Sequence, residues 1–268
     1  MRRLRGARVA ITGASSGIGA AGALAFAREG CRLALAARDE AALAHVAERA
    51  RAAGAAEVRT RRVDVALPQD LQAWAEELQA TWGALDVAVA NAGVGHFGPF
   101  LEAEPEHLER LVQTNLLGVW RTAQAMGPLL EAAHGHLLVV GSVAGKIPLP
   151  YLAAYCGTKA ALLAWSRSVR PELRRRGIAL THLGPGATRT PFAARSLRRP
   201  GLERSDLDER IGRGMAPEGV GRAMVRAARW RPKEMDLTLD GRAGVLAAWV
   251  APHLLARGLE WRMRPKGL

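Results

Sequence analysis

The chain has 268 residues, of which 49% are hydrophobic and 24% are charged, a balance typical of ordinary soluble globular proteins. No apolar run approaches the roughly 20 residues that a membrane-spanning helix needs, and two cysteines without a secretory signal favour reduced thiols and a cytoplasmic location. The formal net charge of +13 would suit an anionic partner, but the arginines are spread along the chain. No basic run alternates with aromatic residues, so we expect no specific nucleic-acid binding. The simpler explanation of the charge is a general bias of the source toward arginine and alanine.

The first predicted element is a strand followed by a glycine-rich turn. Residues 8–12 form a short apolar run, and Gly13, Gly17 and Gly19 follow in the pattern Thr-Gly-x-x-x-Gly-x-Gly. Residues 20–30 are alanine-rich and end in glycine, which predicts a helix. Glycines in such a turn allow a sharp bend and the close approach of a pyrophosphate, toward which the first helical amides point. The stretch predicts a dinucleotide site, and a tight turn without a ligand is the alternative.

A second predicted strand, 32–37, ends at Arg38 and Asp39. The end of this strand is where a dinucleotide-binding fold contacts the adenosine ribose. An acidic residue there would accept a hydrogen bond from a free 2′-hydroxyl, whereas an arginine would pair with a 2′-phosphate. We assign Arg38 to the phosphate, which favours NADP(H) over NAD(H), and Asp39 to the N-cap of the following helix.

Strands and helices go on alternating, without a linker or an internal repeat. This alternation implies right-handed crossovers and one parallel sheet with helices on both faces. We therefore predict a single-domain, Rossmann-like, doubly wound α/β fold over residues 1–242, followed by an apolar and basic C-terminal extension at 243–268. The predicted strands lie at 57–63, 85–90, 137–140 and 178–183, and the predicted helices at 40–53, 68–81 and 105–133 and around Tyr155.

Tyr155 and Lys159 stand four residues apart in a segment rich in alanine and leucine, so a helix places both side chains on one face. A neighbouring cation favours the phenolate and brings the pKa of a tyrosine, ordinarily about 10, toward neutral pH. Ser142 follows the strand that ends at Gly141, where its hydroxyl can hold a carbonyl oxygen beside the tyrosine. The arrangement predicts proton transfer at a carbonyl oxygen. For the tyrosine and lysine alone, a packed ring beside a solvated amine is the alternative.

Together, in this order and spacing, the motifs resemble the short-chain dehydrogenase/reductase family over about residues 5–240. The resemblance implies an oxidoreductase that moves a hydride between NADP(H) and a carbonyl or secondary alcohol. An epimerase or lyase on the same scaffold, or a protein that senses NADP(H) without turnover, is the alternative. The motifs that carry the resemblance are Thr12-Gly-Ala-Ser-Ser-Gly-Ile-Gly19, Asp64, Asn91-Ala-Gly93, Asn115, Ser142, Tyr155-x-x-x-Lys159, and Pro185-Gly186 with Thr190.

The resemblance also implies a role for each catalytic residue. Tyr155 is expected to be the acid/base and Ser142 to bind the substrate oxygen. Lys159 is expected to lower the pKa of Tyr155 and to bind the nicotinamide ribose. Asn115 is expected at a helix distortion whose freed carbonyl binds a water that links Lys159 to solvent. No metal is expected in this site.

The same resemblance implies a set of cofactor-binding residues. Asp64 is expected at the adenine amine and Val65 at the adenine ring. Ser16 stands where other NADP(H)-dependent members place a second basic residue, so Arg38 is expected to act alone. The full expected set is Gly13, Ser15, Ser16, Gly17, Ile18, Gly19, Arg38, Asp64, Val65, Asn91, Ala92, Gly93, Tyr155, Lys159, Pro185, Gly186, Thr188 and Thr190.

Three segments are expected to choose the substrate: the residues after 93, the residues after 142, and residues 188–215. His96 contacts the substrate or, as the more ordinary alternative, is packed or at the surface. Residues 188–215 contain seven arginines and four acidic residues, which would attract an anionic substrate or form a solvated, mobile lid. The expected lining is mainly apolar and consists of Val94, Gly95, His96, Phe97, Val143, Ala144, Ile147, Pro148 and Leu149.

The C-terminal extension is similar to extensions of family members that act on lipids, retinoids or steroids, which favours an apolar substrate. Its apolar residues are expected to cover the chain's own core or a neighbouring subunit of a homodimer or homotetramer. The alternatives are a roof over the substrate cavity and peripheral contact with an anionic membrane through the nearby basic residues. The apolar residues are Leu246, Trp249, Val250, Leu254 and Leu255, and the basic ones are Arg257, Arg262, Arg264 and Lys266.

Overall fold

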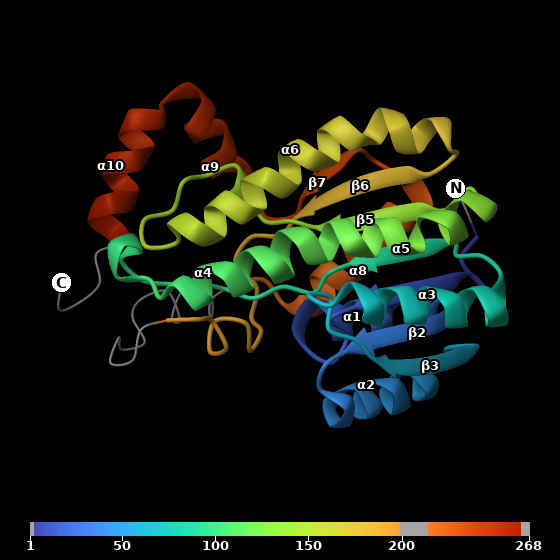
Figure 1. The fold of residues 1–268 in the computed structure, drawn as a ribbon. Helices are drawn as coiled ribbons and strands as arrows, with labels where there is room; N and C mark the ends of the chain where they lie inside the picture. Colours follow the sequence, from blue (N-terminus) through green and yellow to red (C-terminus); the bar gives the residue numbers. More distant parts are fainter. Residues whose placement is uncertain (1–2, 199–213, 264–268) are drawn as a thin grey trace.

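A computed structural model describes residues 3–198 and 214–263 and shows a parallel sheet with helices on both faces (Figure 1). The described strands lie side by side in the order β3-β2-β1-β4-β5-β6-β7, and every pairing between them is parallel. This confirms the predicted doubly wound α/β fold. The strands are β1 (Arg8–Thr12), β2 (Arg32–Ala37), β3 (Glu57–Arg62), β4 (Val87–Ala90), β5 (His136–Val140), β6 (Ala179–Gly184) and β7 (Glu234–Asp236).

Two hydrophobic layers hold the helices on the sheet. Because successive strand residues point to opposite faces, Val9 and Ile11 of β1 enter one layer while Ala10 enters the other. The first layer joins the sheet to α1, α2 and α8, and the second joins it to α3, α5 and α6. The helices of these layers are α1 (Gly17–Arg28), α2 (Glu40–Ala52), α3 (Pro68–Trp82), α5 (Gly118–Ala132), α6 (Ala153–Arg175) and α8 (Pro217–Trp230).

The strand order reverses beside β1, and this reversal positions the site. The chain runs from β1 outward to β2 and β3, and then returns to the other side of β1 as β4. In open α/β sheets, ligands bind outside the carboxyl ends of the strands at such a switch point. The glycine turn after β1 and the segment after β4 meet at this place.

The helical stretch predicted at 105–133 is present, although it is not a regular α-helix throughout. It begins as α4 (Pro105–Val112), passes through a π-helical turn at Gln113–Leu117, and continues as α5. Such π-helical turns are frequent at functional sites. The turn contains Asn115, as the resemblance implied.

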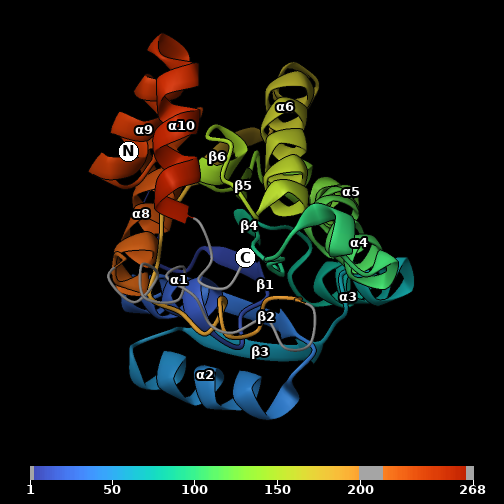
Figure 2. The same cartoon turned by 90° about the vertical axis from the view of Figure 1, so that its left-hand side faces the viewer.

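The C-terminal segment forms two helices, α9 (Leu239–Val250) and α10 (Pro252–Met263), which stand together at one edge of the molecule (Figure 2). α9 packs against the turn at Val143–Gly145. Its apolar residues were expected to cover the chain's own core or a neighbouring subunit. They do not cover the core, since Trp249 is 81% exposed and Leu254 is 72% exposed, and the neighbouring subunit stays a prediction. Leu246 and Val250 are exposed as well. A helix can place apolar residues on an outer face, and nothing in the sequence of this segment chooses between the two faces. Within the described residues, no helix is both long and apolar enough to span a bilayer.

Candidate active site

The glycine turn after β1 lies so close to the segment after β4 that side chains are excluded from it. Gly13 has a φ of +65°, and a Cβ there would lie 2.8 Å from the Cα of Ala92. A Cβ on Gly19 would collide with the carbonyl oxygen of Gly13. Asn91 Nδ2 holds the two segments together by donating to the carbonyl oxygens of Thr12 and Gly13, at 2.9 and 3.1 Å. The bare backbone and the start of α1 therefore suit the pyrophosphate of a dinucleotide.

A cavity of about 740 Å³ lies between this turn, the carboxyl ends of the central strands and the start of α6. Its size is in the range of cofactor sites. All the expected cofactor-binding residues line it except Gly19, which is buried beneath the turn. The structure thus brings together residues from Gly13 to Thr190 that were assigned from separate motifs.

At the end of β2, Arg38 and Asp39 both line the cavity but have different partners. Asp39 Oδ1 accepts a hydrogen bond from the backbone N–H of Ala42 at 3.0 Å, as expected for the N-cap of α2. The side chain of Arg38 is 47% exposed, and its Nη1 lies 3.9 Å from Asp64 Oδ2. Arg38 is therefore the residue at this strand end with a charge available for a ligand.

Tyr155 and Lys159 lie on the first turns of α6, with Lys159 Nζ 5.8 Å from the centre of the Tyr155 ring. Lys159 is buried and donates to the carbonyl oxygen of Val140 at 3.1 Å. Ser142 follows β5 and also lines the cavity, and its Oγ accepts from the Ala144 amide at 3.1 Å. The hydroxyl, the phenol and the ammonium thus meet at one end of the cavity.

Burial shifts both pKa values at this end of the cavity. It raises the pKa of Tyr155 to about 12, although a hydrogen bond with Ser142 acts in the opposite direction. It lowers the pKa of Lys159 to about 8. Lys159 was predicted to lower the pKa of Tyr155. In the protein without cofactor the pKa is raised instead, because burial of the phenolate is the largest effect on it. At neutral pH the phenol therefore keeps its proton.

Asn115 does not line the cavity, because its side chain is fully buried and bound to backbone. Its Oδ1 accepts from the Val94 amide and its Nδ2 donates to the Val94 carbonyl, each at 2.8 Å. Nδ2 also lies 3.4 Å from Thr158 Oγ1 in α6. Asn115 thus joins the π-helical turn to the segment after β4 and to α6, while its expected role with a water stays a prediction.

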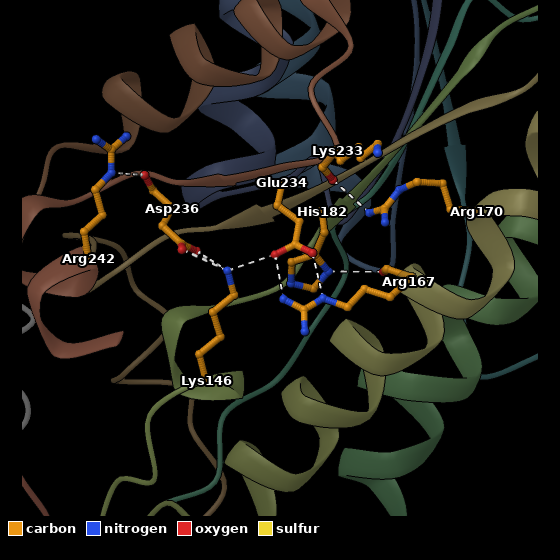
Figure 3. Close-up of polar contacts among 9 residues, drawn as sticks. Lys146, Arg167, Arg170, His182, Lys233, Glu234, Asp236 and Arg242 are labelled. Carbon is orange, nitrogen blue, oxygen red and sulfur yellow. Dashed lines mark hydrogen bonds and ion pairs between the residues drawn. The ribbon is translucent and has the colours of Figure 1, made fainter. Parts of the chain in front are cut away.

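A charged cluster that sequence reasoning missed connects Lys146, in the segment after β5, to β7 (Figure 3). Lys146 Nζ donates to both oxygens of Asp236, at 2.9 and 2.8 Å, and to Glu234 at 3.1 Å. Arg167 of α6 donates to the same Glu234 at 2.7 Å. Lys146 is four residues beyond Ser142, so these ion pairs hold the turn that presents the serine. No local pattern links residues this far apart in the chain.

A buried histidine leaves no room for a side chain at position 141, the residue just before Ser142. The His182 ring from β6 lies so close that any Cβ on Gly141 would collide with it. His182 shares a hydrogen bond of 3.2 Å with Ser166, and burial lowers its pKa to about 3. The imidazole is therefore neutral at physiological pH and fills the space beside Gly141.

The expected substrate lining is partly corrected. Val94, Gly95, Val143, Ala144 and Leu149 line the cavity. His96, Phe97, Ile147 and Pro148 do not; His96 is buried with its ring 6.4 Å from that of His107, as the packed alternative held. Residues 199–213 of the arginine-rich stretch lie outside the described residues. Phe192, Arg195, Ser196 and Leu197, from the predicted segment 188–215, also line the cavity, whereas the sequence analysis did not name the lining residues Arg110, Thr114 and Leu152.

Comparison with known proteins is consistent with this geometry. The family model described as short chain dehydrogenase matches residues 7–200. The chain is 36% identical over 232 residues to the probable oxidoreductase EphD of Mycobacterium tuberculosis. The aligned region covers 82% of this chain but 39% of that protein. The chain thus spans about two fifths of the length of that relative. It is 30% identical to dehydrogenase/reductase SDR family member 7B of Bos taurus, over 97% of this chain and 81% of that protein.

Solved structures with bound nicotinamide cofactors are similar in fold. A short-chain dehydrogenase from Sphingobium yanoikuyae in complex with NADPH has a TM-score of 0.76 and 30% identity, covering 98% of both chains. An alcohol dehydrogenase from Thermococcus sibiricus complexed with 5-hydroxy-NADP has a TM-score of 0.75 and 31% identity, covering 86% of this chain and 95% of that one. A short chain dehydrogenase/reductase from Burkholderia phymatum in complex with NAD has a TM-score of 0.84 and 25% identity, covering 100% and 99%.

Proposed function

Because the chain belongs to the short-chain dehydrogenase/reductase family of oxidoreductases, we propose that it transfers a hydride between NADP(H) and a carbonyl or secondary-alcohol substrate, with Tyr155 as acid/base. The observation that supports this most directly is that Ser142, Tyr155 and Lys159 line the same cavity as the glycine turn. A cofactor on the turn and a substrate at the hydroxyls would therefore share one cavity.

Bound at the turn, the nicotinamide would supply the hydride chemistry, and the protein's own groups would position the substrate and move the proton. Ser142 Oγ would hydrogen-bond the substrate oxygen, and the protonated Tyr155 would hold the proton that a carbonyl oxygen takes up. The Lys159 ammonium, 5.8 Å from the tyrosine ring, would stabilise the phenolate left behind. A panel of ketones and alcohols, followed by the nicotinamide absorbance, tests the proposal. Absence of turnover with every substrate and either cofactor would contradict it.

The choice of NADP(H) rests on Arg38 at the end of β2. An exposed charge-assisted contact is expected to favour NADPH over NADH by about tenfold in affinity. Arg38→Ala should remove most of this preference, measured by calorimetry with each cofactor. Arg49→Ala on the exposed side of α2 is the matched control, because it removes the same charge away from the cavity. Equal affinities of the wild type for both cofactors would overturn the assignment.

The residues around the catalytic end favour an apolar substrate. Val143, Leu149, Leu152 and Phe192 line the cavity there, and the Phe192 ring centre lies 5.8 Å from that of Tyr155. Apolar walls bind apolar molecules because water leaves both surfaces. The panel should therefore include matched ketones of rising chain length. A preference for short polar sugars would contradict this part of the proposal.

The exposed apolar residues of α9 and α10 lead us to propose a homo-oligomer that buries them. Scattered exposed hydrophobics are ordinary, but Leu246, Trp249, Val250, Leu254 and Trp261 are all exposed on one pair of adjacent helices. Light scattering on the wild type and on a Trp249→Glu, Leu254→Glu variant tests the proposal, and the variant should have a lower molar mass. If the mass is unchanged but flotation with anionic vesicles is lost, these helices contact a membrane surface instead.

A further inference from the structure

The segment that follows β6 lies close to the glycine turn at one end and is hydrogen-bonded to the segment after β4 at the other. At one end, a Cβ on Gly17 would lie 3.2 Å from the side chain of Thr190. At the other end, the Leu197 amide donates to the Gly95 carbonyl at 2.8 Å, and the Phe97 amide donates to the Leu197 carbonyl at 3.0 Å. We call residues 190–197 the covering segment. All of its residues except Ala193 and Ala194 line the cavity.

Arg195 is the charged side chain of the covering segment that reaches the glycine turn. Its Nη1 donates to Ser16 Oγ at 3.3 Å. Ser16 is the N-cap residue of α1, yet its hydroxyl makes no hydrogen bond to the backbone of its own helix. Within the described part of the chain, the Arg195 guanidinium has no carboxylate partner. Its remaining N–H groups are therefore available to an anion.

Ser16 and Arg38 belong to the same corner of the cavity. The Ala14 amide, within the glycine turn, donates to the carbonyl oxygen of Ala36 in β2 at 3.1 Å, which places the turn beside the end of that strand. Arg38 and Arg195 both line the cavity, one from the sheet and one from the covering segment. Of the two acidic residues in the lining, Asp39 caps α2 and Asp64 lies beside Arg38.

From this geometry we infer that Arg195 is a second ligand of the 2′-phosphate of NADP(H), facing Arg38. The inference rests on the proposed preference for this cofactor. A phosphate monoester has three oxygens, so two guanidinium groups can each donate to it, and the positive end of α1 adds to their attraction. The sequence offered no basic residue at position 16. The fold instead brings Arg195, 179 residues further along the chain, to the side chain of Ser16.

The inference is tested by the binding of four probes to Arg195→Gln: NADPH, NADH, adenosine 2′,5′-bisphosphate and AMP. Calorimetry should show about a tenfold loss of affinity for NADPH and for the bisphosphate. The affinities for NADH and AMP should stay within about twofold, because neither carries a 2′-phosphate. Arg189→Gln is the matched control: it removes the same charge from a nearby exposed residue that does not line the cavity. Arg195→Lys should retain part of the NADPH affinity.

The outcomes separate this inference from the proposed function. If the wild type binds NADPH and NADH equally, the NADP(H) assignment fails and the inference fails with it. If the wild type prefers NADPH through Arg38 but Arg195→Gln behaves as the control does, the inference alone is overturned. An equal loss for NADPH and NADH would also overturn it, since Arg195 would then act on the pyrophosphate that both cofactors share. Selective loss for the two probes with a 2′-phosphate supports it.

Discussion

Replacing Lys159 by methionine is expected to stabilise the folded protein while it abolishes turnover. The ammonium is buried, and its hydrogen bond to the carbonyl oxygen of Val140 is to a neutral group. Burial lowers the pKa of this lysine from 10.5 to about 8. The residue is therefore charged at neutral pH in a place that disfavours charge, and methionine has a similar length without that cost.

The magnitude follows from the pKa shift. A difference of two to three pKa units corresponds to roughly 3 kcal/mol of unfavourable burial at pH 7. Loss of the bond to Val140 offsets about 1 kcal/mol of the gain. Lys159→Met should therefore raise the free energy of unfolding by about 2 kcal/mol, or the melting temperature by roughly 5 °C for a chain of this size.

The pH dependence distinguishes this cause from better packing. Below pH 8 the lysine is protonated in both the folded and the unfolded chain, so the whole cost is present. Between pH 8 and 10.5 the folded chain loses its proton first, so the stability of the wild type rises with pH. The advantage of Lys159→Met should therefore shrink over this range and be lost before pH 10.5, where the bond to Val140 favours the wild type.

Urea unfolding without cofactor, at several pH values from 7 to 10.5, measures the effect. Lys233→Met at an exposed position is the control, and it should change stability by less than about 0.5 kcal/mol at any pH. A Lys159→Met protein that is less stable than the wild type, or whose advantage does not depend on pH, would refute the reasoning. The same variant should bind NADPH at least tenfold more weakly, because the ammonium is also assigned to the nicotinamide ribose.

Three further predictions concern the same end of the cavity. Tyr155→Phe should lower turnover by at least about a hundredfold while NADPH affinity, measured by calorimetry, stays the same; near-normal turnover would exclude the tyrosine as acid/base. Gly141→Ala drives a methyl group into a buried imidazole and should cost about 1–3 kcal/mol in urea unfolding, so an unchanged midpoint would argue against the tight contact. Arg167, together with Lys146, lowers the pKa of Glu234 to about 2, so wild-type stability should fall as the pH drops from 4.5 toward 2. Lys146→Met should lose stability at pH 7 and show a smaller further loss in acid; an identical acid profile would show that the ion pair does not contribute.

The sequence by itself determined the parts of this protein that depend on local spacing. The glycine turn needs only the positions of Gly13, Gly17 and Gly19, because backbone freedom and close approach are properties of those residues. Tyr155 and Lys159 share a helix face because four residues make about one turn. The buried parallel strands were evident as short apolar runs, since both faces of such a sheet are covered.

The tertiary structure decided whatever depends on residues far apart in the chain. The π-helical turn that interrupts the predicted helix includes Asn115, whose side chain binds the backbone of Val94 after β4. Lys146 meets Asp236 across 90 residues, and no local pattern could reveal the pair.

Composition likewise could not show on which side α9 and α10 expose their apolar residues. Arg195 reaches Ser16 because the sheet brings the turn after β1 and the segment after β6 to the same edge. Local sequence sets conformation within a few residues, whereas the topology of the sheet sets which distant side chains meet.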